Sequence, residues 1–207
     1  TNLAIKGVFE TYTGKGNHII TTNIEHKAVL DACRHLEKQG AAVTYLPVNN
    51  EGLVTAAQVE TAIGPDTVLI VIMYANNELG TLMPIHEIGQ VAKKHKIIFF
   101  TDATQAVGKI PVDVQDSGID ILALTAHKMY GPKGTGALYI RRKNPRVKIK
   151  AQIHGGGHAD LTKAVDGHGG AGHRHLHPGG RRRGGDCRYR GRCSRRAHGA
   201  RRACARR

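Results

Sequence analysis

Residues 122–128 read Leu-Ala-Leu-Thr-Ala-His-Lys, an apolar run that ends in a hydroxyl, an imidazole and a lysine. Together with the isoleucines just before it, the run predicts a buried strand over residues 119–125. In open α/β sheets, ligands bind beyond the carboxyl ends of the strands. Because Lys128 follows such an end, the stretch predicts both a sheet and the edge of that sheet where a site would lie.

Apolar runs and helix-like stretches alternate outward from this strand. Thr55 and Gln58 have the spacing of a capping box, and Pro84 suits the first turn of another helix. The expected strands are 18–22, 43–46, 67–73, 97–101, 119–125 and 134–141, and the expected helices are 2–9, 27–39, 55–63 and 84–95. Strands that alternate with helices predict an α/β fold with a mostly parallel, doubly wound sheet flanked by helices.

Charge is distributed unevenly along the 207 residues, which carry a formal net charge of +15. Residues 1–158 hold 17 Lys and Arg against 13 Asp and Glu, a net of +4, which leaves +11 for residues 159–207. The second part is rich in Gly, Arg and His and has too few large apolar side chains to offset the entropy of ordering it. We expect a folded domain over 1–158 and a disordered basic tail over 159–207.

The start of the chain resembles a helix already in progress, since no capping residue precedes 2–9, and we expect a segment to be missing upstream. No stretch reaches the roughly 18–20 apolar residues that cross a bilayer, and the first residues lack the charged and apolar regions of a signal peptide. These features predict a cytoplasmic protein without a membrane partner.

The four cysteines have no spacing that predicts a disulfide framework or a zinc site. Cys33 lies in an expected helix, whereas Cys187, Cys193 and Cys204 lie in the tail without a C-x-x-C pair. The histidines at 173, 175 and 177 have no acidic or cysteine partners, so they are weak metal ligands. We expect no metal site.

A second chemically important side chain ends a neighbouring expected strand. Asp102 follows the strand 97–101, as Lys128 follows 119–125. Burial disfavours the ammonium form of a lysine, and an uncharged amine can condense with an aldehyde. Pyridoxal phosphate needs such a lysine and an acidic partner for its pyridine nitrogen. The pair therefore favours this cofactor over the alternatives, in which Lys128 simply leaves the sheet and Asp102 caps a helix.

Five stretches closely resemble, in order and spacing, the cysteine desulfurases of the iron–sulfur assembly group. These are class V aminotransferase-like, fold type I pyridoxal phosphate enzymes. The stretches are Glu-His-Lys-Ala-Val at 25–29, Asn-Asn-Glu-Leu-Gly at 76–80, Thr-Asp-Ala-Thr-Gln-Ala-Val-Gly at 101–108, Ala-His-Lys-Met-Tyr-Gly-Pro-Lys-Gly at 126–134 and His-Gly-Gly-Gly-His at 154–158. The resemblance implies the central part of the large domain of such an enzyme.

The resemblance also implies catalytic roles. Lys128 would hold pyridoxal phosphate covalently and then carry the α-proton of the substrate. Asp102 would pair with the protonated pyridine nitrogen. His26 would stack on the pyridine ring and assist proton transfer, as a neutral imidazole can. Without the resemblance, His26 is equally a solvated histidine in the first turn of a helix.

The remaining implied contacts hold the cofactor. Gln105 would hydrogen-bond its phenolic oxygen, and Asn77 would position that oxygen or the substrate carboxylate. Thr125 and His127 would donate hydrogen bonds to the phosphate, with Ala126 between them in the same binding segment. Taken singly, Gln105 and Asn77 are equally well explained as amides that stabilise turns.

The implied reaction removes sulfur from L-cysteine, which leaves alanine and a persulfide on a loop cysteine of the enzyme. In the family, a homodimer passes this sulfur to a scaffold protein. Here the Ala-Thr-Glu phosphate loop expected before Thr1 is absent, and the pattern ends after His158. The small domain with the acceptor cysteine has no counterpart, and no family motif surrounds any of the four cysteines. We expect a fragment that is inactive alone.

Two other functions stay open. Another class V aminotransferase or a selenocysteine lyase would use the same Lys128 and Asp102 with a different substrate loop. A cationic nucleic-acid-binding protein would use the arginine runs at 181–183 and 201–207, and its binding would depend steeply on salt. The tail has a single aromatic residue, Tyr189, for stacking on bases. A reading-frame shift after residue 158 therefore explains it better, and we do not expect nucleic acid as a partner.

Overall fold

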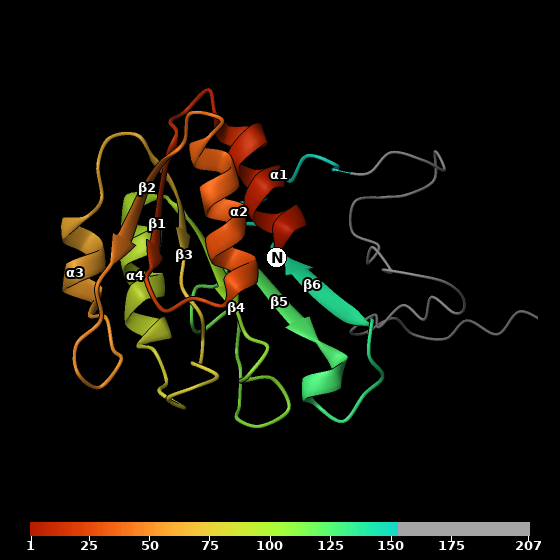
Figure 1. Cartoon of the computed structure of the whole chain (residues 1–207). Coiled ribbons are helices and arrows are strands. Elements are labelled where there is room, and N and C mark those ends of the chain that lie inside the picture. Colours follow the sequence, from red (N-terminus) through yellow and green to blue (C-terminus); the bar gives the residue numbers. More distant parts are fainter. Residues whose placement is uncertain (153–207) are drawn as a thin grey trace, which may run out of the picture. The chain divides into compact units, whose positions relative to one another are not determined.

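Apolar strands and amphipathic helices build a six-stranded sheet with helices on both faces (Figure 1). The computed structural model describes residues 1–152. The strands are β1 (His18–Thr22), β2 (Ala42–Leu46), β3 (Thr67–Val71), β4 (Ile98–Asp102), β5 (Ile121–Thr125) and β6 (Gly136–Ile140). The helices are α1 (Asn2–Tyr12), α2 (Lys27–Glu37), α3 (Ala56–Thr61), α4 (Ile85–His95) and the short 3-10 helix η1 (Ala126–Lys128). The motif at 154–158, the boundary at 158 and the tail lie outside the described residues.

The sheet has the order β2-β1-β3-β4-β5-β6. The first five strands are mutually parallel, and β6 runs antiparallel to β5. Residues 126–135 connect β5 to β6, and this connection is shorter than the dozen or so residues that a parallel crossover needs. The predicted α/β class, with a mostly parallel sheet flanked by helices, is confirmed.

Adjacent residues of a strand point to opposite faces, and each face has its own apolar cluster. Helices α1 and α2 cover one face, where Val8 and Leu36 belong to the same cluster as Phe100. Helices α3 and α4 cover the other face, where Val59 and Ile88 belong to the same cluster as Phe99. All five residues of β3 and of β4 are buried. The strand predicted over 67–73 was expected to be covered on both faces, and β3 lies between the two apolar clusters as expected.

Helix starts follow the local signals closely. The capping box is present, because the Gln58 N–H donates to Thr55 Oγ1 at 3.1 Å and the Thr55 N–H donates to Gln58 Oε1 at 2.8 Å. Pro84 caps α4 from outside rather than lying in its first turn. Strand and helix ends differ from the expected ones by at most two residues, except that α1 runs three residues further than expected, to Tyr12. Strand β4 includes Asp102 itself. None of the helices in residues 1–152 has the length and apolar character to cross a membrane.

Candidate functional site

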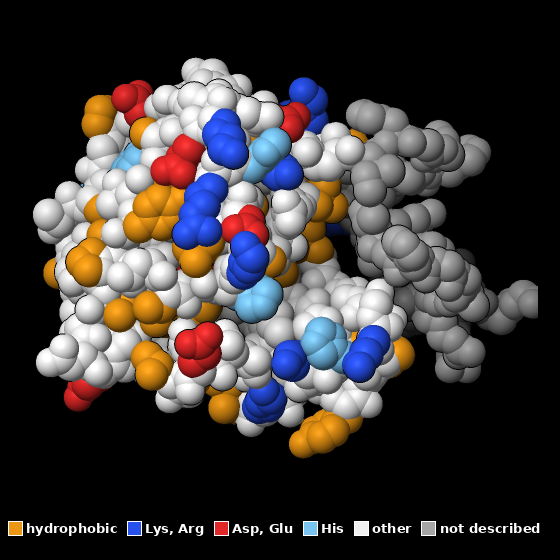
Figure 2. Space-filling view, in the orientation of Figure 1, with side chains coloured by type: hydrophobic (Ala, Val, Ile, Leu, Met, Phe, Trp, Pro, Cys, Tyr) orange, Lys and Arg blue, Asp and Glu red, His pale blue; other side chains and the backbone are white. Residues whose placement is uncertain are grey.

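A cavity of about 350 Å³ opens at the carboxyl edge of the sheet. Figure 2 shows histidine and lysine or arginine side chains around a recess on this edge. Its lining includes seven of the eight predicted site residues: His26, Asn77, Asp102, Gln105, Thr125, His127 and Lys128. Segments up to about 100 residues apart in sequence therefore converge on one cavity, as the resemblance requires.

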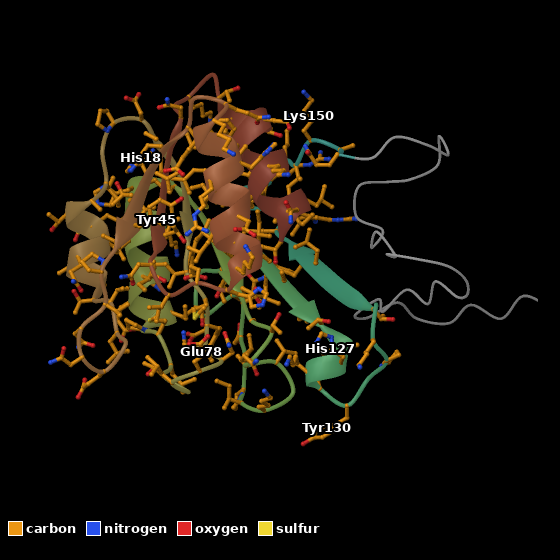
Figure 3. All side chains as sticks on the ribbon, in the orientation of Figure 1. His18, Tyr45, Glu78, His127, Tyr130 and Lys150 are labelled. Carbon is orange, nitrogen blue, oxygen red and sulfur yellow. The ribbon has the colours of Figure 1, made fainter. Side chains whose placement is uncertain are left out.

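The topology of the sheet explains this convergence. Strands β2 and β3 lie on opposite sides of β1, so the chain changes direction across the sheet at β1. Such a switch point leaves a crevice beyond the carboxyl ends of the strands. His26 follows β1, Asp102 ends β4, and Lys128 follows β5. Figure 3 shows His127 at this edge and His18 at the opposite one.

His26 is held at the start of α2. It is the N-cap residue, and its Nδ1 accepts a hydrogen bond from the Ala28 N–H at 3.2 Å. In a neutral imidazole, a ring nitrogen that accepts leaves the proton on the other one. The cap therefore places the proton on Nε2. His26 is exposed, as the solvated-histidine alternative expects, and it also lines the cavity, as the cofactor-binding role expects.

Asp102 stabilises a turn and also lines the cavity. Its carboxyl is buried, and Oδ1 accepts a hydrogen bond from the Thr104 N–H at 3.0 Å. A carboxylate has about four acceptor sites, so this turn leaves capacity for another donor. Gln105 lies three positions after Asp102, and its Oε1 accepts a hydrogen bond from Lys109 Nζ at 2.6 Å. That bond leaves the Gln105 amide donors available to a ligand.

A hydroxyl and an imidazole lie together beyond β5. Thr125 Oγ1 is 2.9 Å from His127 Nδ1 and also donates to the Thr135 carbonyl at 3.3 Å. Ala126 does not line the cavity. Its N–H donates to the Thr135 carbonyl, and its own carbonyl accepts from Met129 and Gly131. Ala126 thus holds the turn, and its contact with a bound group stays a prediction.

Lys128 lines the cavity but is exposed, contrary to the burial expected for it. The strand β5 ends at Thr125, and η1 carries the lysine beyond the covered part of the sheet. The exposure of Lys128 is therefore a property of this turn. Its place at the cavity wall, next to the Thr125–His127 pair, agrees with the prediction.

Two neighbouring asparagines have different positions. Asn77 is exposed and lines the cavity. Asn76 is buried and organises the loop, because its Oδ1 accepts from the N–H groups of Glu78 and Leu79, both at 2.8 Å. Asn76 therefore stabilises this turn, and the two explanations of Asn77, as a ligand contact or as a turn amide, both stay predictions.

Sequence reasoning assigned no role to Glu25, Met73 and Lys109. Glu25 belongs to the motif that contains His26, yet only the structure shows that its carboxyl is buried. The spacing of four residues between Gln105 and Lys109 was a usable signal for their contact. Met73 lines the cavity and carries no chemical signal in the sequence.

Cys33 is buried inside α2, and burial raises the pKa of its thiol to about 12. A thiol in that state supplies little thiolate, which is the nucleophilic form. This favours the prediction that Cys33 does not accept sulfur. Within residues 1–152, no three His, Cys, Asp or Glu side chains are grouped to hold a metal ion.

Comparisons with known proteins agree with this geometry. The chain is 57% identical over 157 residues to cysteine desulfurase IscS of Glaesserella parasuis serovar 5 (strain SH0165), covering 76% of this chain and 38% of that protein. It therefore spans about two fifths of that relative's length. A solved structure of SspA in complex with cysteine matches with a TM-score of 0.71 and 51% identity, over 76% of this chain and 45% of the other.

A solved NifS-like protein also has a TM-score of 0.71, with 41% identity over 76% of this chain and 43% of that one. The aminotransferase class-V family profile matches residues 1–174, which include every predicted site residue. The match covers well over half of the chain. The protein belongs to the class V aminotransferase family, and its relatives there include cysteine desulfurases.

Proposed function

We propose that the cavity binds pyridoxal phosphate and that the chain is the cofactor-binding part of a cysteine desulfurase. One observation carries the proposal. The buried carboxyl of Asp102 ends β4, the amine of Lys128 follows the neighbouring β5, and both line the same cavity as His26 and the Thr125–His127 pair. The high identity to cysteine desulfurases supports the reaction class.

The side chains present fit the chemical groups of this cofactor. Lys128 is the amine that would join the aldehyde, and Asp102 is the acid that would pair with the pyridine nitrogen. His127, whose Nδ1 is 2.9 Å from Thr125 Oγ1, would offer its other ring nitrogen to a phosphate, and the Thr125 hydroxyl would donate there once it turns away from the Thr135 carbonyl. Gln105 keeps its amide donors available because Lys109 occupies its oxygen. The Nε2–H of His26 is available at the cavity because Nδ1 is used by the cap.

The proposed reaction consumes L-cysteine and an acceptor thiol and yields alanine and a persulfide. The acceptor sulfur bonds to the cysteine sulfur, the Cβ–S bond breaks, and Cβ keeps the electron pair and takes up the proton that the acceptor thiol loses. The transferred sulfur is therefore oxidised while Cβ is reduced, and no outside oxidant is needed. Bound in the cavity, pyridoxal phosphate supplies an electron sink for charge that develops at the substrate α-carbon. Lys128 then takes and returns the α-proton, and Asp102 keeps the pyridine nitrogen protonated. His26 assists proton transfer at the neighbouring positions.

On the same resemblance, we propose that the protein serves iron–sulfur cluster assembly in the cytoplasm. It would act as a homodimer and pass sulfur to a scaffold protein. The same Lys128 and Asp102 would also serve another class V aminotransferase or a selenocysteine lyase. The solved relative in complex with cysteine favours L-cysteine as the substrate.

Covalent labelling tests the proposal. The protein is incubated with pyridoxal phosphate, reduced with borohydride, digested and mapped by mass spectrometry, and we expect the label on Lys128. Lys128→Ala should lose it, while Lys133→Ala, a matched change in the following loop, should keep it. A label on Lys133 or Lys109 instead would refute the assignment of the cofactor-binding lysine.

A further inference from the structure

Glu25 is a buried acid next to the cavity-lining His26, and the proposed chemistry gives it no task. Its side chain is 4% exposed, and it immediately precedes His26. One carboxyl oxygen, Oε1, accepts two hydrogen bonds at 2.9 Å, from Thr22 Oγ1 and from the Met73 N–H. The other oxygen, Oε2, is buried without a hydrogen-bond partner in the described part of the chain.

These two bonds join segments on both sides of the topological switch point. Thr22 is the last residue of β1, and Met73 lies two residues beyond the end of β3. Met73 and His26 both line the cavity. A single oxygen of Glu25 thus connects the turn that presents His26 to a second segment that lines the cavity, although Glu25 and Met73 are 48 residues apart.

We propose that Glu25 is a positioning residue, whose carboxyl holds the β1–α2 turn against the segment after β3 and thereby sets where His26 stands at the cavity. The inference deepens the proposed function, on which its consequence for the cofactor rests. The positional claim itself concerns only the folded chain.

The surroundings of Glu25 indicate that it does this work as a neutral acid. Burial, and to a smaller extent the charge of Asp102, raise the pKa of Glu25 to about 8, against the opposing effect of its two hydrogen bonds. The titratable groups facing it are Asp102 at the end of β4 and Cys33 on α2, with His26 next in the chain. A buried oxygen without a partner is tolerated far better with a proton than with a charge.

A glutamine has the shape of a protonated glutamic acid, which makes Glu25→Gln the informative variant. Its amide oxygen can accept both hydrogen bonds, so we expect it to preserve the turn. Glu25→Ala leaves the Met73 N–H and the Thr22 hydroxyl unpaired. Val29→Ala is the matched control, because Val29 is fully buried on α2 but does not line the cavity.

Nuclear magnetic resonance of the histidine-labelled protein without cofactor is the first readout. We expect Glu25→Ala to shift the His26 ring signals, and Glu25→Gln and Val29→Ala to leave them in place. His18, at the opposite edge of the sheet, serves as the internal reference (Figure 3). Unchanged His26 signals in Glu25→Ala would overturn the proposal whatever the cofactor does.

Affinity for pyridoxal phosphate is the second readout. Glu25→Ala should raise the dissociation constant about tenfold or more, because two buried donors lose their acceptor. Glu25→Gln should stay close to the unaltered protein. If Val29→Ala weakens binding as much as Glu25→Ala, the effect is general destabilisation and the proposal fails. If Glu25→Gln binds as weakly as Glu25→Ala, the positioning group is a charged carboxylate and the neutral-acid account is wrong.

The pH dependence of unfolding gives a third readout. Because the folded pKa of Glu25 lies above the ordinary 4.5, ionisation opposes folding, and stability should fall as pH rises from 4.5 to about 8. Glu25→Gln should remove that part of the slope. A slope unchanged in Glu25→Gln would contradict a neutral Glu25. A protein that passes these cofactor-free tests but takes no label on Lys128 would refute the proposed function alone.

Discussion

The Asp120–Arg141 ion pair should contribute strongly to stability, and Arg141→Met is the change that tests it. Arg141 Nε lies 2.9 Å from Asp120 Oδ1, and the two side chains are only 13% and 10% exposed. The guanidinium also donates to the Ile119 carbonyl at 2.8 Å. Asp120 immediately precedes β5, the strand that leads to Lys128, so the pair anchors one end of the element that carries the site.

The magnitude follows from what the substitution leaves behind. Removing one partner of a buried pair costs about 3–5 kcal/mol, because the remaining charge is desolvated and uncompensated. The Phe99 N–H still donates to Asp120 Oδ2 at 3.1 Å, so the carboxylate is not wholly deprived of partners. We therefore expect the lower half of that range at neutral pH. The two hydrogen bonds of Arg141 to backbone carbonyls account for part of this loss.

The cost should depend on pH in a defined direction. Burial raises the pKa of Asp120 above 3.8, while Arg141 and the Phe99 N–H oppose the rise. Removing Arg141 raises that pKa further, and a raised folded pKa destabilises the protein only where the unfolded carboxyl is ionised. Arg141→Met should therefore lower the free energy of unfolding more at neutral pH than near pH 3.8, the ordinary pKa of an aspartate. Near pH 3.8, only the loss of about 1–2 kcal/mol from the missing hydrogen bonds should remain.

Urea unfolding followed by circular dichroism measures these differences. Asp120→Asn combined with Arg141→Met should be more stable at neutral pH than Arg141→Met alone, because the asparagine still accepts from Phe99 and carries no charge. An equal cost at both pH values would refute the reasoning. A double variant no more stable than the single one would show that the orphaned charge is not the cause.

Three further predictions concern the site and the sheet. Asp102→Ala should weaken retention of pyridoxal phosphate roughly tenfold to a hundredfold, with Asp102→Glu partly tolerated; an unchanged absorption spectrum and affinity would reduce the carboxyl to the cap of the Thr104 turn. His18 bridges Thr67 and Thr44 at 2.7 and 2.8 Å, and burial lowers its pKa against the opposing charge of Asp66. Because the folded pKa of His18 lies below its ordinary 6.5, the free energy of unfolding should decrease as pH falls below 6.5. In thermal unfolding, His18→Gln should reduce this decrease. Gly89→Ala should destabilise by about 1–3 kcal/mol, despite better helix propensity, because a Cβ there would meet the Ser117 carbonyl oxygen; Gly14→Ala, with open space around it, is the control, and equal urea midpoints would contradict the clash.

The sequence by itself determined the elements and the side chains at their ends. The apolar run of β3 predicted a buried strand, that of β4 predicted a strand, and the Thr55–Gln58 spacing predicted a capping box that the structure contains. Asp102 and Lys128 could be placed after two strands for the same reason. Burial patterns and caps depend on residues within a few positions of one another, so they can be inferred without knowing the fold.

Only the tertiary structure decided which of these ends meet. The strand order, the antiparallel β6, the bond between Glu25 and Met73 and the pair of Asp120 with Arg141 all join residues at least 11 positions apart. The exposure of Lys128 likewise depends on where η1 leaves the sheet. Parallel strands pair across crossovers, and their order depends on how whole helices cover both faces of the sheet. A local pattern holds no information about that packing.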